Sequence, residues 1–458
     1  MLRRSRVKAK SSRICGAGRT VPTIALLLVM LLPSASRAQQ SSERLPQVTI
    51  AKSPIPPGTV IDTHNWQQYK DYMQDGLRAL FEGTYFWKFP PDFQLVIGRA
   101  RHYPMPKQYV SDTEKYSPQV RIVAMPDGSH RLSGYVAGLP FPNPAEPLKA
   151  WKLLVDMWYV YNPHLQCRYN TFYTEDRFAN VSEEDAFEVD RRLRNISDPG
   201  QPVDDPRNAG IQFSYWVQVS SPEESKYVTN LTLHYADPAK PVDVFLFIPA
   251  LRRSLRLSSA ARCAPLLGTD LAQDDAWRSN FNGNFEIFDG KVLREGYDIV
   301  QMRANLERLA ALSNYYMPVM FPKPSVGKWT VRPVWVVDIR RIPSQSAGYC
   351  YGKKIFYVDK EMYSALWADA YDFNMKLWKL MSINQFEHYV PQIGLTVFAQ
   401  QWTDTIWDVQ NDHITQGMAT NRGGDPTADN EECRDYHGKN YDNISRYSYS
   451  SGLSEILR

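Results

Sequence analysis

The chain has 458 residues, and its 13% aromatic content with 12 Trp can fill the core of one large β domain or two. The formal net charge is +4, but residues 1–38 hold eight Lys or Arg and no Asp or Glu. Without them, 45 basic residues stand against 49 acidic ones, a net charge of −4. This balance excludes a nucleic-acid-binding function that rests on a basic surface.

Residues 1–38 have the pattern of a secretory signal peptide. A basic stretch precedes the apolar run Ile24–Leu32, which is too short to span a bilayer as a mature helix. Ser36-Arg37-Ala38 ends in a small-x-small cleavage signal. We expect export and cleavage after Ala38. An uncleaved anchor is the alternative, which Pro33 and the small residues disfavour.

Composition divides the rest of the chain into three parts. Residues 39–57 are polar and Pro-rich, as in a loose leader. Residues 58–416 predict a single β domain with insertions, because strand patterns recur along them. Residues 417–458 are rich in Gly, Asn, Ser and Tyr and predict a polar C-terminal arm, in part disordered.

Two segments have the periodicity of a helix. One is Lys149–Tyr161; the other precedes Gly83, a residue that can end a helix. The second helix either packs in the core or lies across the mouth of a cavity. Its apolar face carries Trp66, Tyr69, Met73, Leu77, Leu80 and Phe81.

Lys353–Ile383 predicts three antiparallel strands. Lys354–Asp359, Tyr363–Tyr371 and Lys376–Ile383 are rich in β-branched and aromatic residues, and short polar turns separate them. Connections this short make neighbouring strands antiparallel. Further strands are expected at Gln119–Ala124, His130–Val136, Gln212–Ser220, Tyr227–Tyr235, Asp243–Ile248 (an apolar run typical of a strand buried on both sides), Leu251–Leu257, Trp329–Ile342, Ile393–Gln401 and Thr405–Gln410. Phe86–Val96 and Gln108–Pro118 are expected to be irregular.

Aromatic side chains on these strands exceed what one face of a thin sheet needs. A curved sheet lined in this way can enclose an apolar ligand, with helices over its mouth. An ordinary core is the alternative. We therefore predict a mainly β (α+β) fold, a large curved antiparallel sheet or half-open β-barrel with helices covering a cavity. The candidates to line that cavity are Trp335, Phe356, Tyr357, Tyr363, Trp367, Trp378 and Phe398.

Sequence motifs for catalysis are absent. The chain has no Gly-x-Ser-x-Gly, Walker phosphate loop, His-Glu-x-x-His or Cys-x-x-Cys, and no two of its eight His lie four residues apart. We expect a protein that is not an enzyme and that has no metal site and no cofactor.

Acidic residues gather in the polar segment Gly268–Phe288. Asp270, Asp274 and Asp275 could bind calcium or serve in acid–base chemistry. The interpretation we favour is a solvated loop whose carboxylates pair with Arg252, Arg253 or Arg262.

Four cysteines follow residue 38. An even number in an oxidising compartment suggests two disulfides, with three pairings open. Buried free thiols are the alternative. The four are Cys167, Cys263, Cys350 and Cys433.

Three segments carry a distinctive sequence. They are Pro57-Gly58-Thr59 through Trp66-Gln67-Gln68-Tyr69-Lys70 to Gly76-Leu77, then Gly138-Leu139-Pro140-Phe141-Pro142, and Lys354-Ile355-Phe356-Tyr357-Val358-Asp359 with Tyr371-Asp372 and Leu377-Trp378-Lys379. With the region Arg252–Asp275, they resemble a bacterial domain family of unknown function known as outer-membrane lipoprotein-sorting proteins. The likeness covers most of the chain after residue 57, and none of its motifs is catalytic.

The resemblance implies a fold like the LolA and LolB lipoprotein carriers, a half-open antiparallel barrel whose helices plug a hydrophobic cavity. It also implies a periplasmic protein of Gram-negative bacteria, associated in some cases with the outer membrane. We expect a carrier or chaperone for a lipid, a lipoprotein acyl chain or similar apolar cargo. The alternatives are a structural partner of an outer-membrane β-barrel or inner-membrane exporter, and a hydrolase acting on a hydrophobic substrate through Asp270, Asp274 or Asp275.

Overall fold

The computed structural model describes residues 53–237, 240–257, 263, 265–305, 308, 311–390, 393–419 and 427–457. The expected signal peptide and most of the expected leader lie outside the described residues. All described residues belong to one compact unit that spans residues 41–458.

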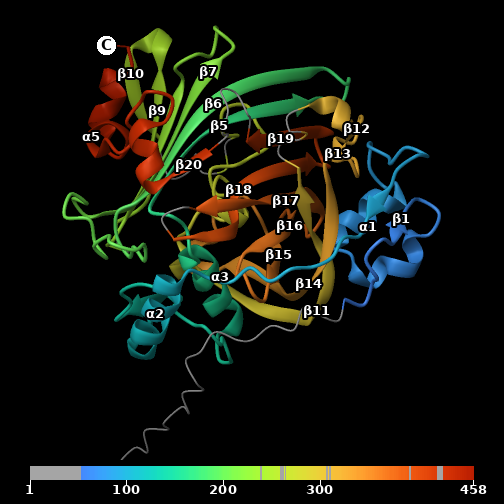
Figure 1. Cartoon of the computed structure of the whole chain (residues 1–458), viewed down its shortest axis with the longest axis horizontal. Coiled ribbons are helices and arrows are strands. Elements are labelled where there is room, and N and C mark those ends of the chain that lie inside the picture. The colour runs from blue at the N-terminus through green and yellow to red at the C-terminus, as the bar shows by residue number, and fades with distance from the viewer. Residues whose placement is uncertain are drawn as a thin grey trace, which may run out of the picture. The chain divides into compact units, whose positions relative to one another are not determined.

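One large sheet dominates this unit (Figure 1). Within the described residues, 13 strands follow a single path. In spatial order they are β10 (Arg253–Leu257), β9 (Asp243–Ile248), β8 (Thr229–Tyr235), β7 (Ile211–Ser221), β6 (Val181–Arg192), β5 (Leu165–Glu175), β19 (His413–Ala419), β18 (Leu395–Asp408), β17 (Leu377–Val390), β11 (Phe288–Ala304), β14 (Gly327–Arg341), β15 (Lys353–Asp359) and β16 (Ala365–Tyr371).

Short elements surround the sheet. The small strands are β1 (Val60–Ile61), β2 (Leu95–Val96), β3 (Arg121–Ala124), β4 (His130–Ser133), β12 (Tyr315–Tyr316), β13 (Phe321–Pro322) and β20 (Thr427–Asp429), of which β20 pairs with β5. The α-helices are α1 (Asp75–Glu82), α2 (Lys107–Tyr116), α3 (Lys149–Tyr159) and α5 (Ile444–Tyr447), and the 3-10 helices used below are η1 (Trp66–Tyr72), η9 (Asn430–Asp435) and η10 (Ser450–Glu455).

The pairing of the strands confirms the expected fold class. The predicted three-stranded meander is present as β15, β16 and β17, joined by antiparallel ladders. Strand β17 also pairs with β18 and makes one parallel pair with β11, so that β11, β14, β15, β16 and β17 close into a ring. The sheet is therefore curled at this end and open at β10.

Alternate residues of each strand face opposite sides of the sheet, as pleating requires. In β5, Phe172 joins one apolar cluster and Cys167 another, and in β7 Tyr215 and Trp216 divide in the same way. We call the side of Phe172 and Tyr215 the inner face and the side of Cys167 and Trp216 the outer face.

The inner face curves around residues 265–287, which we call the inner segment. Its Asn282 Oδ1 accepts from His234 Nε2 of β8 at 2.8 Å, and its Asn280 carbonyl accepts from Lys354 of β15 at 2.9 Å. In a flat sheet with this strand order, the nine strand spacings between β8 and β15 would cover roughly 43 Å. Asn280 and Asn282 are only two residues apart, and together with the side chains of His234 and Lys354 they span far less than this distance. Both flanks of the sheet must therefore bend toward the segment. Figure 1 shows β5 and β6 arching on one side and β11 and β14 on the other.

The N-terminal region covers part of the outer face and differs from the predicted single helix. The apolar stripe is divided between η1 and α1, because Met73 is extended and Gln74 is buried with its Nε2 donating to the carbonyl of Ile299 at 2.8 Å. Gly83 ends α1 in a left-handed conformation, as expected. The stripe lies in the core, in one cluster with Tyr357 and Trp367.

Other helices and strands also differ from those predicted from the sequence. Strands Ile393–Gln401 and Thr405–Gln410 are one continuous strand, β18. The stretch expected to be irregular at Gln108–Pro118 holds α2. Strand β9 was expected to be buried on both sides, but half of it is only partly buried because a single edge strand, β10, lies beyond it.

The C-terminal residues are part of the fold, which corrects the expectation of a loose arm. Beyond residues 420–426, which are not described, β20, η9, α5 and η10 pack on the outer face of β5, β6 and β7. A disulfide from Cys433 to Cys167 ties this segment to β5.

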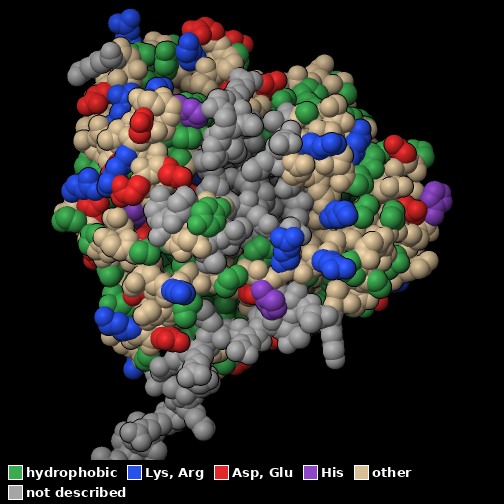
Figure 2. All heavy atoms as spheres, viewed as in Figure 1, with side chains coloured by type: hydrophobic (Ala, Val, Ile, Leu, Met, Phe, Trp, Pro, Cys, Tyr) green, Lys and Arg blue, Asp and Glu red, His purple; other side chains and the backbone are tan. Residues whose placement is uncertain are grey.

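Among the described residues, no helix is both long and apolar enough to cross a membrane. Figure 2 shows basic and acidic side chains interspersed on the face that it displays.

Candidate functional site

The inner segment fills the space that the curved sheet encloses. Trp277 packs on Phe213 of β7 with ring centroids 4.3 Å apart, and Phe281 lies 6.2 Å from Phe356 of β15. With α3, these rings form one apolar cluster against the inner face. These buried rings of the inner segment explain why a segment with an otherwise polar sequence lies inside the curved sheet.

A small apolar pocket lies between the inner segment and the sheet. It is lined by Phe172, Tyr215 and Val217 of the strands and by Leu266, Leu267, Thr269, Leu271 and Ala276 of the segment. Its free volume is about 10 Å³. A cavity needs roughly 10–15 Å³ to hold one water molecule. The segment itself therefore occupies the place that a larger apolar ligand could take.

Asp275 is a fully buried polar group that holds the segment in place. Lys354 of β15 forms an ion pair with its carboxylate, and the Tyr351 hydroxyl donates to its Oδ2 at 2.5 Å. The side chains of Asp275 and Lys354 are 0% and 5% exposed. Burial, then the charge of Asp275, raises the pKa of Tyr351 well above its usual value, so this phenol remains a donor.

Asp270 forms a second attachment at β19. Its Oδ2 accepts from the Thr415 hydroxyl and contacts His413 Nδ1, both at 2.7 Å. The hydrogen bond to Asp270 raises the pKa of His413 above its usual 6.5 against the effect of burial. Lys379 of β17 donates to the Asp270 carbonyl oxygen at 2.6 Å, so this loop end is held through side chain and backbone.

Further contacts attach the other end of the segment. Asp274 lies 3.4 Å from Arg341 of β14, and Asn280 donates to Asp404 of β18 at 3.2 Å. Burial raises the pKa of Asp404 well above its usual value, so the fold favours its neutral form.

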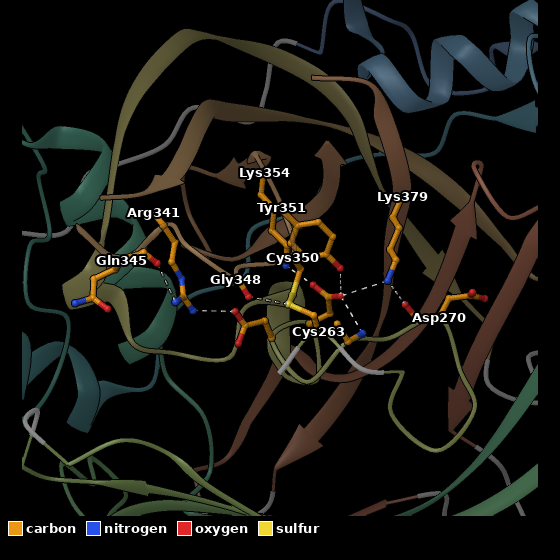
Figure 3. The surroundings of a disulfide bond; sticks show 12 residues. Cys263, Asp270, Arg341, Gln345, Gly348, Cys350, Tyr351, Lys354 and Lys379 are labelled. Carbon is orange, nitrogen blue, oxygen red and sulfur yellow. Dashed lines mark hydrogen bonds and ion pairs between the residues drawn. A yellow bond between two sulfur atoms is a disulfide. The ribbon is translucent and has the colours of Figure 1, made fainter. Parts of the chain in front are cut away.

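A disulfide fixes the start of the segment. Cys263 and Cys350 are bonded, and Cys350 precedes Tyr351 and β15. Figure 3 shows Lys354, Tyr351 and Lys379 converging on the segment from the sheet beside this disulfide. The segment is therefore anchored covalently at one end and by polar side-chain contacts along its length.

These contacts overturn the expectation that the acidic cluster is a solvated loop paired with Arg252, Arg253 or Arg262. Asp270, Asp274 and Asp275 are buried, and their partners are side chains of β14, β15 and β19. Arg252 and Arg253 lie exposed at the start of β10, and Arg262 lies outside the described residues. The contacts that replace them come from strands far away in the sequence, which the local pattern could not indicate.

The candidate cavity residues do not gather around one cavity. Trp335, Phe356 and Tyr363 are buried on the inner face with Trp378 packed against them, whereas Tyr357 and Trp367 are buried on the outer face. The side chain of Phe398 lies outside the described residues. None of the other six, whose side chains the structure describes, is among the residues that line the pocket under the inner segment.

Sequence reasoning predicted β7 as the strand Gln212–Ser220, but it missed β5, which supplies the rest of the pocket wall, and the role of the lysines that hold the segment. A usable signal existed in Lys354 and Lys379, which interrupt strands otherwise rich in aromatic and aliphatic residues. A cation on a buried strand requires an anionic partner. That partner had to be an acidic segment elsewhere in the chain.

Within the described part of the chain, no group of three or more His, Cys, Asp or Glu side chains is arranged to hold a metal ion. The acidic side chains of the inner segment bind protein cations and hydroxyls instead, as given above.

Comparison with known proteins identifies the family. A family model described as "Protein of unknown function (DUF1329)" matches residues 60–446, so the chain belongs to this family. The uncharacterized protein PA3922 of Pseudomonas aeruginosa is 20% identical over 340 residues, which cover 73% of this chain and 70% of that protein.

Two solved structures are partly similar to the chain. A DUF1329 family protein from Desulfovibrio piger has 12% identity and a TM-score of 0.42, covering 60% of this chain and 91% of the other. A LolA superfamily protein from Nitrosomonas europaea has 13% identity and a TM-score of 0.35, covering 61% and 91%.

Proposed function

We propose that this member of the DUF1329 family is a carrier, not an enzyme, that binds an apolar ligand between the inner segment and the inner face of the sheet. The ligand class is a lipid, the acyl chain of a lipoprotein or a similar apolar molecule. The supporting observation is that the apolar space inside the sheet is filled by a segment of the chain that polar side chains hold in place. Displacing the segment would free that space.

An acyl chain would offset part of the cost of such an exchange. Phe172, Tyr215 and Val217 would lose their apolar cover when the segment moves, at a cost of roughly 25 cal/mol per Å² exposed. An acyl chain that takes its place gains about 0.8 kcal/mol for each buried CH₂. A ligand could therefore replace the segment without specific polar contacts, as a carrier of varied apolar cargo requires.

The proposal assigns no catalytic role to Asp270, Asp274 or Asp275. Each of these carboxylates contacts a cation or hydroxyl of the sheet. Their work in this account is to keep the segment closed until ligand or a partner displaces it.

The proposed location is the periplasm. Disulfides persist in oxidising compartments, and the chain pairs Cys167 with Cys433 and Cys263 with Cys350. The signal-peptide pattern of residues 1–38 agrees with export. An outer-membrane β-barrel or an inner-membrane exporter remains the proposed kind of protein partner.

Binding of dodecanol, a neutral apolar probe, tests the proposal. A ligand's apparent affinity falls with the fraction of protein in the binding-competent state. The Lys354→Met variant weakens the hold on the segment and should bind dodecanol more tightly than the wild type in equilibrium dialysis. Val217→Asp in that background should abolish binding, because it places a charge in the pocket wall.

Val181→Asp is the matched control, since it makes the same substitution at a residue of β6 that is 44% exposed and does not line the pocket under the inner segment. It should leave dodecanol binding unchanged. Equal, weak binding by all four proteins, each shown to be folded by circular dichroism, would contradict the proposal.

A further inference from the structure

A second, larger pocket lies on the outer face, away from the inner segment. Its volume is about 540 Å³, within the range of roughly 300–1,000 Å³ that small-molecule sites occupy. One wall is the outer face of β5, β6 and β7, and the other is the C-terminal segment that the Cys167–Cys433 disulfide holds against the sheet. The pocket is thus built from two parts of the chain joined covalently next to it.

Aromatic rings line the floor of this pocket. Phe187 of β6 stacks on Tyr441 with centroids 4.2 Å apart and contacts Tyr169 of β5 at 5.1 Å. Tyr447 of α5 lies 5.4 Å from Tyr441, and Tyr227 stands at the rim, 39% exposed. Such a set of rings offers flat apolar surface to a ligand.

The charged side chains that line the pocket, among the residues that the structure describes, are all cations. They are Lys226, Lys439 and Arg446, and no described Asp or Glu is part of the lining. Lys226 is paired with Glu223 at 2.9 Å. The Nε of Arg446 is buried and has no hydrogen-bond partner among the described residues. A buried donor left without an acceptor is costly, so an anion would be stabilised here.

Nearby acidic groups are engaged elsewhere. Asp442 forms ion pairs with Arg191 and Arg434 and is not part of the lining. The field inside the pocket is therefore positive beside an apolar floor.

We infer that this pocket is a second binding site, for an organic anion with an apolar body and one carboxylate or phosphate group. The apolar body lies on the Phe187 and Tyr441 rings, and the anionic group lies between Lys439 and Arg446. The site is separate from the carrier site under the inner segment, because the sheet stands between them. It would bind its ligand whether or not the inner segment opens.

Titration calorimetry with four probes tests this inference on the full chain: dodecanoate, dodecyl phosphate, dodecanol and inorganic phosphate, all below micelle-forming concentration. Dodecanoate or dodecyl phosphate should bind at least about tenfold more tightly than inorganic phosphate, because only they contact the rings. Which of the two binds more tightly distinguishes a carboxylate from a phosphate ligand.

The variant Lys439→Gln/Arg446→Gln should weaken binding of the anionic amphiphiles about tenfold or more, through loss of charge-assisted contacts. Tyr227→Asn, at a residue whose φ of 70° suits Asn, should weaken binding of the amphiphiles but not of inorganic phosphate. Lys107→Gln, on exposed α2, is the control for loss of a positive charge and should change nothing.

The inference is overturned if the folded Lys439→Gln/Arg446→Gln variant binds the anionic amphiphiles as tightly as the wild type, or if inorganic phosphate binds as tightly as dodecyl phosphate. Binding at the inner site is recognised by its sensitivity to Val217→Asp, which should not affect binding in the outer pocket. Failure of the carrier proposal would therefore appear as dodecanol binding that Val217→Asp does not reduce, with the result for the anions unchanged.

Discussion

Lys354 of β15 and Asp275 of the inner segment form an ion pair that is buried at both ends. The pair joins the predicted meander to the acidic segment 79 residues earlier in the chain. Both groups are removed from water, and each has a further partner: the Tyr351 hydroxyl donates to Asp275, and Lys354 donates to the Asn280 carbonyl.

Replacing Lys354 by Met should loosen the inner segment. Removing one partner of a buried ion pair costs about 3–5 kcal/mol, since the other charge remains without compensation. Hydrogen exchange of residues 265–287 should accelerate roughly a hundredfold, while that of β14 and β15 changes less.

The neighbouring residue provides the control for this substitution. Lys353 lies on the same strand with its ammonium 4.2 Å from the Tyr371 ring, away from the inner segment. Lys353→Met should leave exchange of the inner segment unchanged. Equal acceleration in both variants would mean that the ion pair does not hold the segment.

The attachment through His413 should depend on pH. The pKa of His413 is raised in the fold, chiefly by its hydrogen bond to Asp270. The stability that protonated His413 gives to this attachment is fully present below the pKa of the unfolded state, near 6.5. It is lost as the pH rises through the higher pKa of the folded state. After correction for intrinsic rates, exchange at the Asp270 end of the segment should therefore increase between about pH 6 and 9. His413→Gln should abolish this increase, and an increase that persists in the variant would exclude His413 as its source.

Asp369 should make folding stability fall as pH rises toward neutrality. Burial raises the pKa of Asp369 to about 7, although Trp367 Nε1 donates to it at 2.8 Å. The neutral Asp369 carboxyl contributes to the free energy of unfolding in full below about pH 4. This contribution is lost as the pH rises through about 7, where the folded carboxyl ionises. The Asp369→Asn protein should gain roughly 2–4 kcal/mol relative to the wild type over that interval, in urea unfolding at several pH values. A constant difference between the two proteins would rule this out.

The disulfide between Cys167 and Cys433 should stabilise the whole unit, since it closes a loop of 266 residues. Replacing both cysteines by Ser should lower the free energy of unfolding by about 2–5 kcal/mol. It should also weaken binding in the outer pocket, whose C-terminal wall it holds. Urea unfolding without reductant measures the first effect, and an unchanged midpoint would show that the wall is held by packing alone.

Trp367 should matter for stability and not for binding of apolar ligands. Its side chain is 0% exposed on the outer face and packs on Trp407. Trp367→Ala should cost about 3–5 kcal/mol in unfolding experiments. Dodecanol affinity measured below the new midpoint should be unchanged, and a selective loss of affinity would place the ligand on the other side of the sheet.

The sequence predicted the elements whose local pattern agrees with their final environment. The meander Lys353–Ile383 has aromatic strands and polar turns, and both remain visible because every contact that forms it is local. The same holds for α3 and for the hairpin of β3 and β4.

Strands β5 and β6 were missed because they carry buried charges. Arg168 pairs with Glu188 and Asp190 inside the sheet at 2.6 and 2.9 Å, so both strands look polar in sequence. Alternation of apolar and polar residues then no longer marks the buried face. The charges of Arg168, Glu188 and Asp190 compensate one another only when β5 and β6 pair. The two strands pair in register from Leu165 to Glu175 of β5.

The candidate site was the part least open to prediction. Its apolar wall comes from β5 and β7, its cover from the acidic segment, and its attachments from β14, β15 and β19. Each part has an ordinary sequence. The site exists only because the sheet curves, and that curvature is set by long-range pairing.

Native mass spectrometry of the protein purified from the cell envelope, followed by organic extraction, tests the central claim most directly. The account predicts a discrete additional mass that passes into the organic phase as a lipid or similar apolar compound. The carrier claim would be contradicted if the wild type and the Lys354→Met variant both showed only the mass of the polypeptide.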